Sequence, residues 1–144
     1  MSTRTQIVVE GNEKVKIYKH SDGYPSGVLP TLQKLLPLFQ KNRGFDPEYL
    51  TAHISYAFIQ ESIDSMREYR KEFPNRGGVD EGPSFTGHGL DTQFHSDIEY
   101  LYRVNKDFSV DVMSPVSHDS SLPTAKIIKH YTLAQLVKAK TFKD

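Results

Sequence analysis

The apolar pattern between Asp46 and Pro74 constrains the fold of this chain more than any other feature. Asp46 can accept hydrogen bonds from the free amides of a helix start, and Pro47 has the φ angle of a first helical position. Apolar side chains then recur at steps of three and four residues, at Tyr49, Ala52, Tyr56, Ile59, Ile63, Met66 and Phe73. The spacing predicts one amphipathic helix of about 26 residues, or roughly 39 Å, that ends before Pro74.

The predicted helix exceeds the span of the single domain that 144 residues normally form. We therefore expect one end of it to protrude or to form a contact between two copies of the chain. Leu50, Ile54 and Phe58 widen the apolar stripe only in the first half of the helix. The N-terminal turns should therefore be buried more deeply than the charged turns 67–72.

Alternating and β-branched residues predict strands on both sides of the helical region. These runs are 5–10, 15–20, 94–104, 108–113 and 126–131. The first two flank Gly11-Asn12, which has the turn chemistry of a hairpin. The run 94–104 alternates most regularly, so it is the strongest strand signal in the chain.

Two further helices are predicted, and with them the fold class. Leucines at helical spacing over 29–39 predict a helix that should stop or kink near Leu36, because Pro37 lacks a backbone donor. Thr132 and Gln135 have the spacing of a capping box, so a short helix should close the chain. The order ββ-α-α-ββ-β-α predicts an α+β fold, with an antiparallel sheet of about five strands and the helices packed on one face.

Composition limits the class of protein and its partners. We expect one domain over residues 1–144, with a flexible glycine-rich loop at about 74–90. Eighteen basic residues balance 18 acidic ones, so no broad positive field favours duplex nucleic acid as a partner. The chain has no cysteine, which excludes disulfides and thiolate chemistry and is compatible with a reducing cytoplasm. No apolar run approaches the roughly 20 residues of a membrane span, so we expect a soluble, cytoplasmic protein without a membrane partner.

Residues that could bind a ligand gather in one loop and on one predicted strand face. The segment 18–27 holds two glycines and a proline between aromatic rings, which makes it a shaped loop rather than a spacer. On the predicted strand 94–104, alternate polar side chains project the same way about 7 Å apart. The candidate ligand-binding residues are Arg4, Tyr18, His20, Asp22, Tyr24, His95, Asp97 and Glu99.

Two kinds of site are compatible with these residues, and neither includes a predicted catalytic residue. Tyrosines could line a pocket that stacks on a flat ligand such as a nucleobase, or they could be half-buried sheet residues. His20 and Asp22 could join His95 and Asp97, with Glu99 as a further candidate, in a nitrogen and oxygen ligand set for a divalent metal. The same strand face could equally meet solvent, as one face of an antiparallel sheet commonly does. We expect no cofactor other than such a divalent metal ion.

Three short motifs cover about a sixth of the chain: Ser2-Thr3-Arg4, the loop from Tyr18 through Asp22-Gly23-Tyr24-Pro25-Ser26-Gly27, and Asp97-Ile98-Glu99-Tyr100-Leu101-Tyr102. Together they resemble a group of small phage and bacterial proteins that begin near Gly-Thr-Arg-Ser and carry an Asp-Gly-Tyr-Pro-Ser-Gly loop and an Asp-x-Glu-Tyr strand. No activity is established for that group, so the resemblance implies a phage or bacterial source and no mechanism. It groups Arg4, Asp22 and Glu99 in one constellation, in which Arg4 could also pair with either acid to pin the fold.

These observations favour a small phage-type accessory protein, active in the host cytoplasm if phage-encoded. We expect a non-catalytic binding module for a host protein or a small nucleotide-like ligand, with a role in counter-defence as one form of that function. A metal-dependent phosphoesterase or hydrolase that uses the His, Asp and Glu cluster is the alternative. A structural or assembly protein, in which the long helix supplies a homodimer or higher oligomer contact, is a further one.

Overall fold

The N-terminal hairpin begins the sheet, as its sequence predicts. In the computed structural model, which describes residues 2–74, 86–117 and 124–144, β1 (Thr5–Val9) pairs antiparallel with β2 (Lys16–Lys19). Gly11 has a φ angle of 89° in the connecting turn, a conformation that side chains rarely permit. Ile7 and Ile17 lie opposite each other and are fully buried, so the hairpin register places its apolar face in the core.

The long helix has the bounds that its sequence predicts. It is α2 (Pro47–Glu72), and the Asp46 side chain accepts a hydrogen bond from the Tyr49 amide at its start. The closing helix α3 (Leu133–Lys138) is likewise confirmed, with the complete capping box of Thr132 and Gln135.

The first helix begins earlier than predicted and does not stop near Leu36. It is α1 (Pro25–Asn42), so it begins inside the predicted loop and continues past Leu36 and Pro37. A proline inside a helix costs about 3 kcal/mol. Leu36 and Phe39, on either side of Pro37, are both buried in the core that α1 shares with the sheet and α2, and this packing offsets the missing hydrogen bond.

The sheet is mixed and has six strands, so the prediction of an antiparallel sheet was wrong in this respect. The other strands are β3 (His88–Asp91), β4 (Tyr100–Val104), β5 (Val110–Ser117) and β6 (Thr124–Tyr131). The order is β3-β2-β1-β4-β5-β6, and β1 pairs with β4 in parallel while the other pairs are antiparallel. β3 is the added strand. It begins at the end of the predicted glycine-rich loop, of which residues 75–85 are outside the described residues.

Only the second half of the predicted strand 94–104 is a strand. β3 lies beside β2, whereas β4 lies beside β1, so residues 92–99 must cross the sheet between them. This crossing is what makes β1 and β4 parallel. The Gln6 side chain donates to the Gln93 carbonyl and accepts from the His95 amide, so backbone groups that a strand would pair are bound by a side chain instead.

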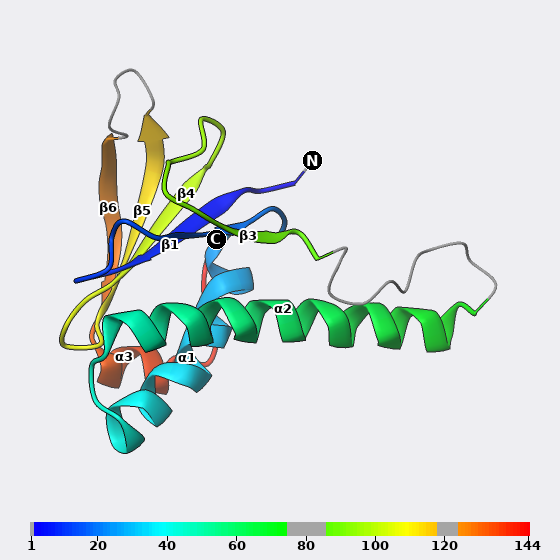
Figure 1. Cartoon of the computed structure of the whole chain (residues 1–144), viewed down its shortest axis with the longest axis horizontal. Helices are drawn as coiled ribbons and strands as arrows, with labels where there is room; N and C mark the ends of the chain where they lie inside the picture. The colour runs from blue at the N-terminus through cyan, green and yellow to red at the C-terminus, as the bar shows by residue number, and fades with distance from the viewer. Residues whose placement is uncertain (1, 75–85, 118–123) are drawn as a thin grey trace.

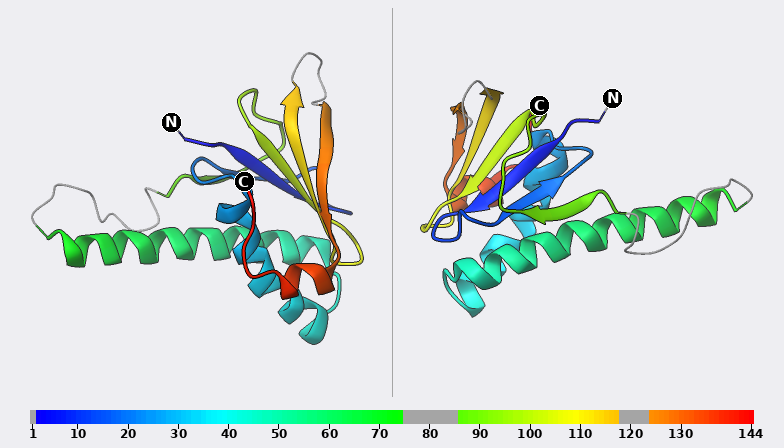
Figure 2. Two further views of the ribbon diagram at one scale, coloured as in Figure 1. Left: turned by 180° about the vertical axis from the view of Figure 1, so that it is seen from behind. Right: turned by 45° about the horizontal axis from the view of Figure 1, so that its top comes forward.

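All three helices cover one face of the sheet, as predicted (Figure 1). Buried apolar residues of β1, β2, β4 and β5 join those of the helices in one core, against which Tyr131 of β6 packs. The core includes Ile7, Val9, Ile17, Leu29, Leu32, Leu50, Ile54, Phe58, Tyr102, Val104, Val110 and Val112. The C-terminal half of α2 extends beyond the sheet (Figures 1 and 2). Ile63 is its only buried residue after Phe58, so the expected protruding end is confirmed.

In the described part of the chain, none of the helices combines the length and apolarity that crossing a membrane requires.

Candidate functional site

The Asp22-Gly23-Tyr24-Pro25 segment forms a tight joint between β2 and α1. The Gly23 amide donates to the Thr3 carbonyl at 2.9 Å, and the buried Tyr102 hydroxyl donates to the Gly23 carbonyl at 2.7 Å. Asp22 has a φ angle of 55°, and its carboxylate accepts from the Tyr24 hydroxyl at 2.8 Å. Among the described residues, the Asp22 and Tyr24 side chains bond to each other and to no other predicted site residue. The motif therefore has a structural role, whatever else it binds.

Most of the other predicted residues meet on the sheet face that the helices leave open. Because side chains alternate along a strand and Ile17 faces the core, Tyr18 points to the opposite face. The His95 ring stacks on the Tyr18 ring, with centroids 4.0 Å apart and planes inclined by 18°. The Tyr18 hydroxyl lies 2.9 Å from His20 Nδ1. The structure thus brings His95, which is distant in sequence, beside the Tyr18 and His20 side chains of the β2 end.

Charged groups flank this aromatic stack. Arg4 Nε lies 3.3 Å from Asp97 Oδ2, and His95 Nε2 lies 3.2 Å from Asp91 Oδ2. About a third of the Arg4 and His95 side chains is exposed, at 34% and 32%. We call the six residues Arg4, Tyr18, His20, Asp91, His95 and Asp97 the open-face cluster. Its members are held together, but they remain accessible to a ligand.

The crossing segment 92–99 holds His95 over the sheet. Gln6 is fully buried beneath it and bonds to the Gln93 carbonyl at 3.1 Å and the His95 amide at 2.9 Å. The Lys16 ammonium donates to the Thr92 carbonyl at 3.3 Å and lies 4.7 Å from the centre of the Phe94 ring. Side chains of β1 and β2 therefore fix the position of the crossing segment.

Two residues of the open-face cluster have shifted pKa values. Partial burial, and then the charge of Asp97, raise the pKa of the Tyr18 hydroxyl, while the nearby Arg4 opposes the shift. Tyr18 is therefore neutral at physiological pH. A hydrogen bond from the Gln93 amide is the main cause that lowers the pKa of Asp91, and His95 adds to it. Asp91 is therefore a carboxylate beside the His95 ring.

Glu99 does not join this cluster through its side chain, which is exposed. Its amide donates to the Arg4 carbonyl at 2.8 Å and extends the pairing of β1 with β4. The expectation that Arg4 pairs with Asp22 or Glu99 was wrong, because its partner is Asp97. Asp97 belongs to the crossing segment rather than to a strand, so its side chain can turn back toward Arg4.

The predicted metal ligands do not converge. Within residues 2–74, 86–117 and 124–144, no three His, Asp or Glu side chains lie close enough to hold one metal ion. The predicted set His20, Asp22, His95, Asp97 and Glu99 falls entirely within these ranges. The arrangement described here therefore offers the metal-dependent alternative no assembled ligand set.

Sequence reasoning missed Asp91 and Gln6. Gln6 carries a signal, because it is a polar residue in an otherwise β-branched run that starts the sheet. A buried polar side chain needs hydrogen-bond partners, and here they are backbone groups of the crossing segment. Asp91 carried no such signal, because the sequence places it in a glycine-rich region without a clear period.

A second polar pair, Lys19 and His88, was also missed and lies on the helix-covered face. The two residues are register partners in β2 and β3. The Lys19 ammonium donates to the Ser21 carbonyl at 2.6 Å. His88 stacks on Phe58 at 6.0 Å, and its buried ring nitrogens have no hydrogen-bond partner among the described residues. Burial, and then the charge of Lys19, lower the pKa of His88 to about 4.

Comparison of the chain with protein-family models, with curated proteins and with solved structures finds no match.

Proposed function

We propose that the protein is a non-catalytic binding module that holds a small, planar, anionic ligand of the nucleotide type at the open-face cluster. The observation that carries this proposal is the half-buried Tyr18–His95 stack with the Arg4 guanidinium beside it. Such a module would suit a phage accessory or counter-defence protein, and the sequence motifs imply a phage or bacterial source.

The aromatic stack supports recognition of a base. Nucleobases stack on aromatic side chains with about 1 to 3 kcal/mol per base, and the contact tolerates any base because each has a π face. His95 is held flat against Tyr18 on one side, by Asp91 at its edge and by Gln6 through its amide. A preorganised ring loses little freedom when a ligand binds, which favours affinity.

Arg4 supports recognition of the anionic group. Its Nε is paired with Asp97, and a guanidinium has five N–H donors, so donors remain for a phosphate oxygen. The pairing also fixes the direction of the side chain. Asp91 and Asp97 reduce the positive potential of the cluster, so we expect a ligand with one phosphate group to bind better than one with a triphosphate.

Binding of adenosine monophosphate, followed by NMR shifts of the His95 and Tyr18 signals, tests the proposal. Arg4→Gln should weaken binding at least tenfold, and His95→Ala should abolish the shifts of the Tyr18 ring. Arg103→Gln is the matched control, since Arg103 is also an ion-paired arginine of the sheet, with 38% of its side chain exposed against 34% for Arg4.

Three outcomes would contradict the proposal. In the first, neither adenosine monophosphate nor guanosine monophosphate shifts the NMR signals of the cluster. In the second, Arg4→Gln and Arg103→Gln weaken binding equally. In the third, the nucleotide is recovered as a cleaved product, and the protein is then an enzyme. Mass spectra of the native and the denatured protein complement this test, because a ligand that co-purifies is released on unfolding.

A further inference from the structure

The outer edge of β6 is open in the described part of the chain. β6 (Thr124–Tyr131) is the last strand in the sheet order, and β5 is its only partner among the described strands. It contains no proline. An edge strand presents a row of N–H and C=O groups on its outer side that can pair with another chain. At eight residues, β6 is twice as long as β3, which forms the other edge.

Two neighbouring isoleucines of β6 face solvent. Ile127 is 54% exposed and Ile128 is 53% exposed. The register with β5 pairs Met113 with Ile127 and Val112 with Lys129, so it skips Ile128. Ile128 lies instead on a groove of about 500 Å³, whose lining includes Pro25, Val112, Ile128, Lys129, Tyr131, Thr141 and Lys143. The open edge thus has apolar contact surface beside its backbone groups.

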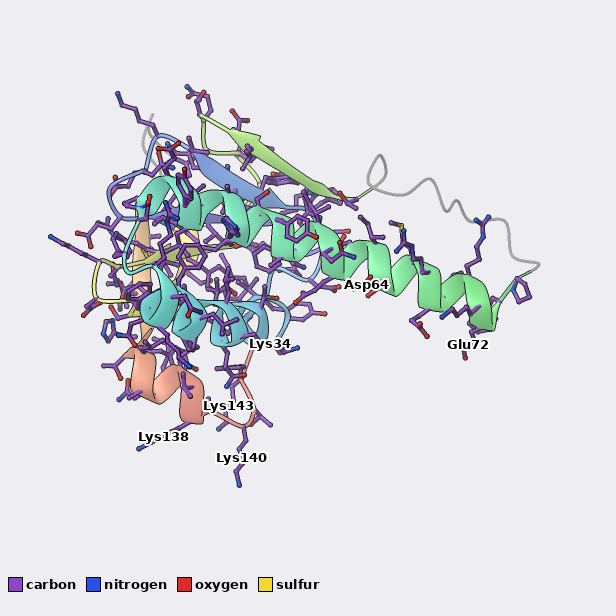
Figure 3. The ribbon with its side chains drawn as sticks, turned by 60° about the horizontal axis from the view of Figure 1, so that its bottom comes forward. Lys34, Asp64, Glu72, Lys138, Lys140 and Lys143 are labelled. Carbon is purple, nitrogen blue, oxygen red and sulfur yellow. The ribbon has the colours of Figure 1, made fainter. Side chains whose placement is uncertain are left out.

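The charge near this edge is positive apart from Asp111 of β5, which is paired with His130 of β6. Residues 124–143 contain five lysines and no acidic residue, although the whole chain is neutral. Lys129 and Lys143 line the groove. The nearest acid in sequence, Asp144, is engaged at the start of α1, where its carboxylate accepts from the Ser26 amide and hydroxyl. Figure 3 shows Lys138, Lys140 and Lys143 on the side of α1 and α3, while Asp64 and Glu72 lie on the protruding helix.

We propose that an extended acidic segment of a partner protein binds the β6 edge as an additional strand of the sheet. Its backbone would pair with the outer side of β6. Its acidic side chains would meet Lys126 and Lys129, and its apolar side chains would cover Ile127 and enter the groove beside Ile128. This is the strand-addition mode of peptide recognition, in which main-chain hydrogen bonds give affinity and side-chain pockets give specificity.

Charge disfavours a second copy of the chain in the register that would pair the isoleucines of the two copies. An antiparallel two-fold pairing of two β6 strands about Ile127 and Ile128 would set Lys126 of each copy opposite Lys129 of the other. Like charges directly opposite each other in a sheet are destabilising. An acidic segment turns the same positions into favourable pairs. A nucleic acid would use the lysines, but it would not use the backbone edge or the isoleucines.

Selection from a display library of random octapeptides on the intact protein tests the proposal. We expect enrichment of sequences in which acidic residues alternate with β-branched ones. A synthetic peptide of the most enriched sequence should protect β6 amides from hydrogen exchange. The double variant Lys126→Gln/Lys129→Gln should weaken its binding at least tenfold. Lys14→Gln is the control, because Lys14 is an exposed lysine in the β1–β2 turn.

Other outcomes would overturn the proposal. These are no enrichment above background, enriched peptides without acidic residues, or equal binding by the double variant and the wild type. Concentration-dependent protection of β6 without peptide would show that a second copy occupies the edge. A poly-thymidine oligonucleotide that displaces the peptide from the lysines but leaves the β6 amides unprotected would assign the surface to nucleic acid.

Ile127→Thr provides a second variant, because threonine also favours a β-strand. It should weaken peptide binding while the β1 amides stay protected from hydrogen exchange, which would show that the sheet is intact.

Discussion

A β-carbon on Gly27 would lie 2.1 Å from the carbonyl oxygen of Asp22, so the first turn of α1 and the end of the β2 loop meet through bare backbone. The Gly27 amide also donates to the Tyr24 carbonyl at 2.8 Å. Because the obstacle is backbone, no flexible side chain can move away from an added methyl group. We predict that Gly27→Ala lowers the free energy of unfolding by about 1 to 3 kcal/mol, measured by urea denaturation.

Gly89 provides the control for this prediction. A β-carbon at Gly89 would meet nothing within 4 Å, so Gly89→Ala should change the free energy of unfolding much less. Equal effects of the two substitutions would show that the joint between β2 and α1 can relax, and that its glycine is not required by packing.

The Tyr102 hydroxyl fastens the same joint to β4. Its bond to the Gly23 carbonyl is 2.7 Å long, and both residues are buried. In Tyr102→Phe the carbonyl would remain buried without that partner, so we predict a loss of about 1 to 3 kcal/mol in the free energy of unfolding. Tyr100→Phe is the comparison, because the Tyr100 hydroxyl has no hydrogen bond within the described structure. A similar loss of stability in both variants would show that the bond from the Tyr102 hydroxyl to the Gly23 carbonyl does not stabilise the joint.

Elements whose signals are local were predictable from the sequence. Asp46-Pro47 and Pro74 bracket α2, Thr132 with Gln135 starts α3, and Gly11-Asn12 turns the first hairpin. Each signal acts within a few residues, through a cap, a fixed φ angle or a turn conformation. The prediction of α1 was less accurate because local chemistry at Pro37 competes with distant packing of Leu36 and Phe39, and the packing prevails.

The sheet order depends on contacts that the sequence does not display. The alternation over residues 94–104 is real, but half of it belongs to a segment that Gln6 binds through its side chain. The sequence does not reveal that contact, so its alternating pattern predicts one long strand and, with it, an antiparallel sheet. The candidate site was predicted in part. Five of its predicted residues do come together, namely Arg4, Tyr18, His20, His95 and Asp97. The other three lie at backbone joints nearby, namely Asp22, Tyr24 and Glu99.

Gln6 should control the order of the crossing segment. In Gln6→Leu the buried side chain keeps a similar size but loses its bonds to the Gln93 carbonyl and the His95 amide. We predict faster hydrogen exchange at the His95 amide and a loss of about 1 to 3 kcal/mol in stability. Gln93→Ala should leave the exchange rate of that amide unchanged, because Gln6 bonds only to the main chain of Gln93. Unchanged exchange in Gln6→Leu would refute this role.

His88 should make stability sensitive to mild acid. Its pKa is lowered to about 4 in the folded protein, first by burial and then by the charge of Lys19. An unfolded histidine has a pKa of about 6.5, so between these values the unfolded chain binds a proton that the folded protein does not. Stability therefore falls as the pH decreases from about 6.5 to about 4, and the contribution of this group becomes constant below that range.

We predict that His88→Phe removes this part of the pH dependence. Phenylalanine keeps a flat ring against Phe58 and has no nitrogen to leave unbonded, so the variant should also be more stable than the wild type near neutral pH. Urea midpoints of both proteins at about pH 7 and about pH 5 provide the test, since most carboxylates titrate below this window. The difference between the urea midpoint of His88→Phe and that of the wild type should be larger at about pH 5 than at about pH 7. His53→Phe, at an exposed histidine of α2, controls for the loss of an imidazole. A difference between the variant and wild-type midpoints that is the same at both pH values would show that His88 takes up its proton equally in the folded and unfolded chain.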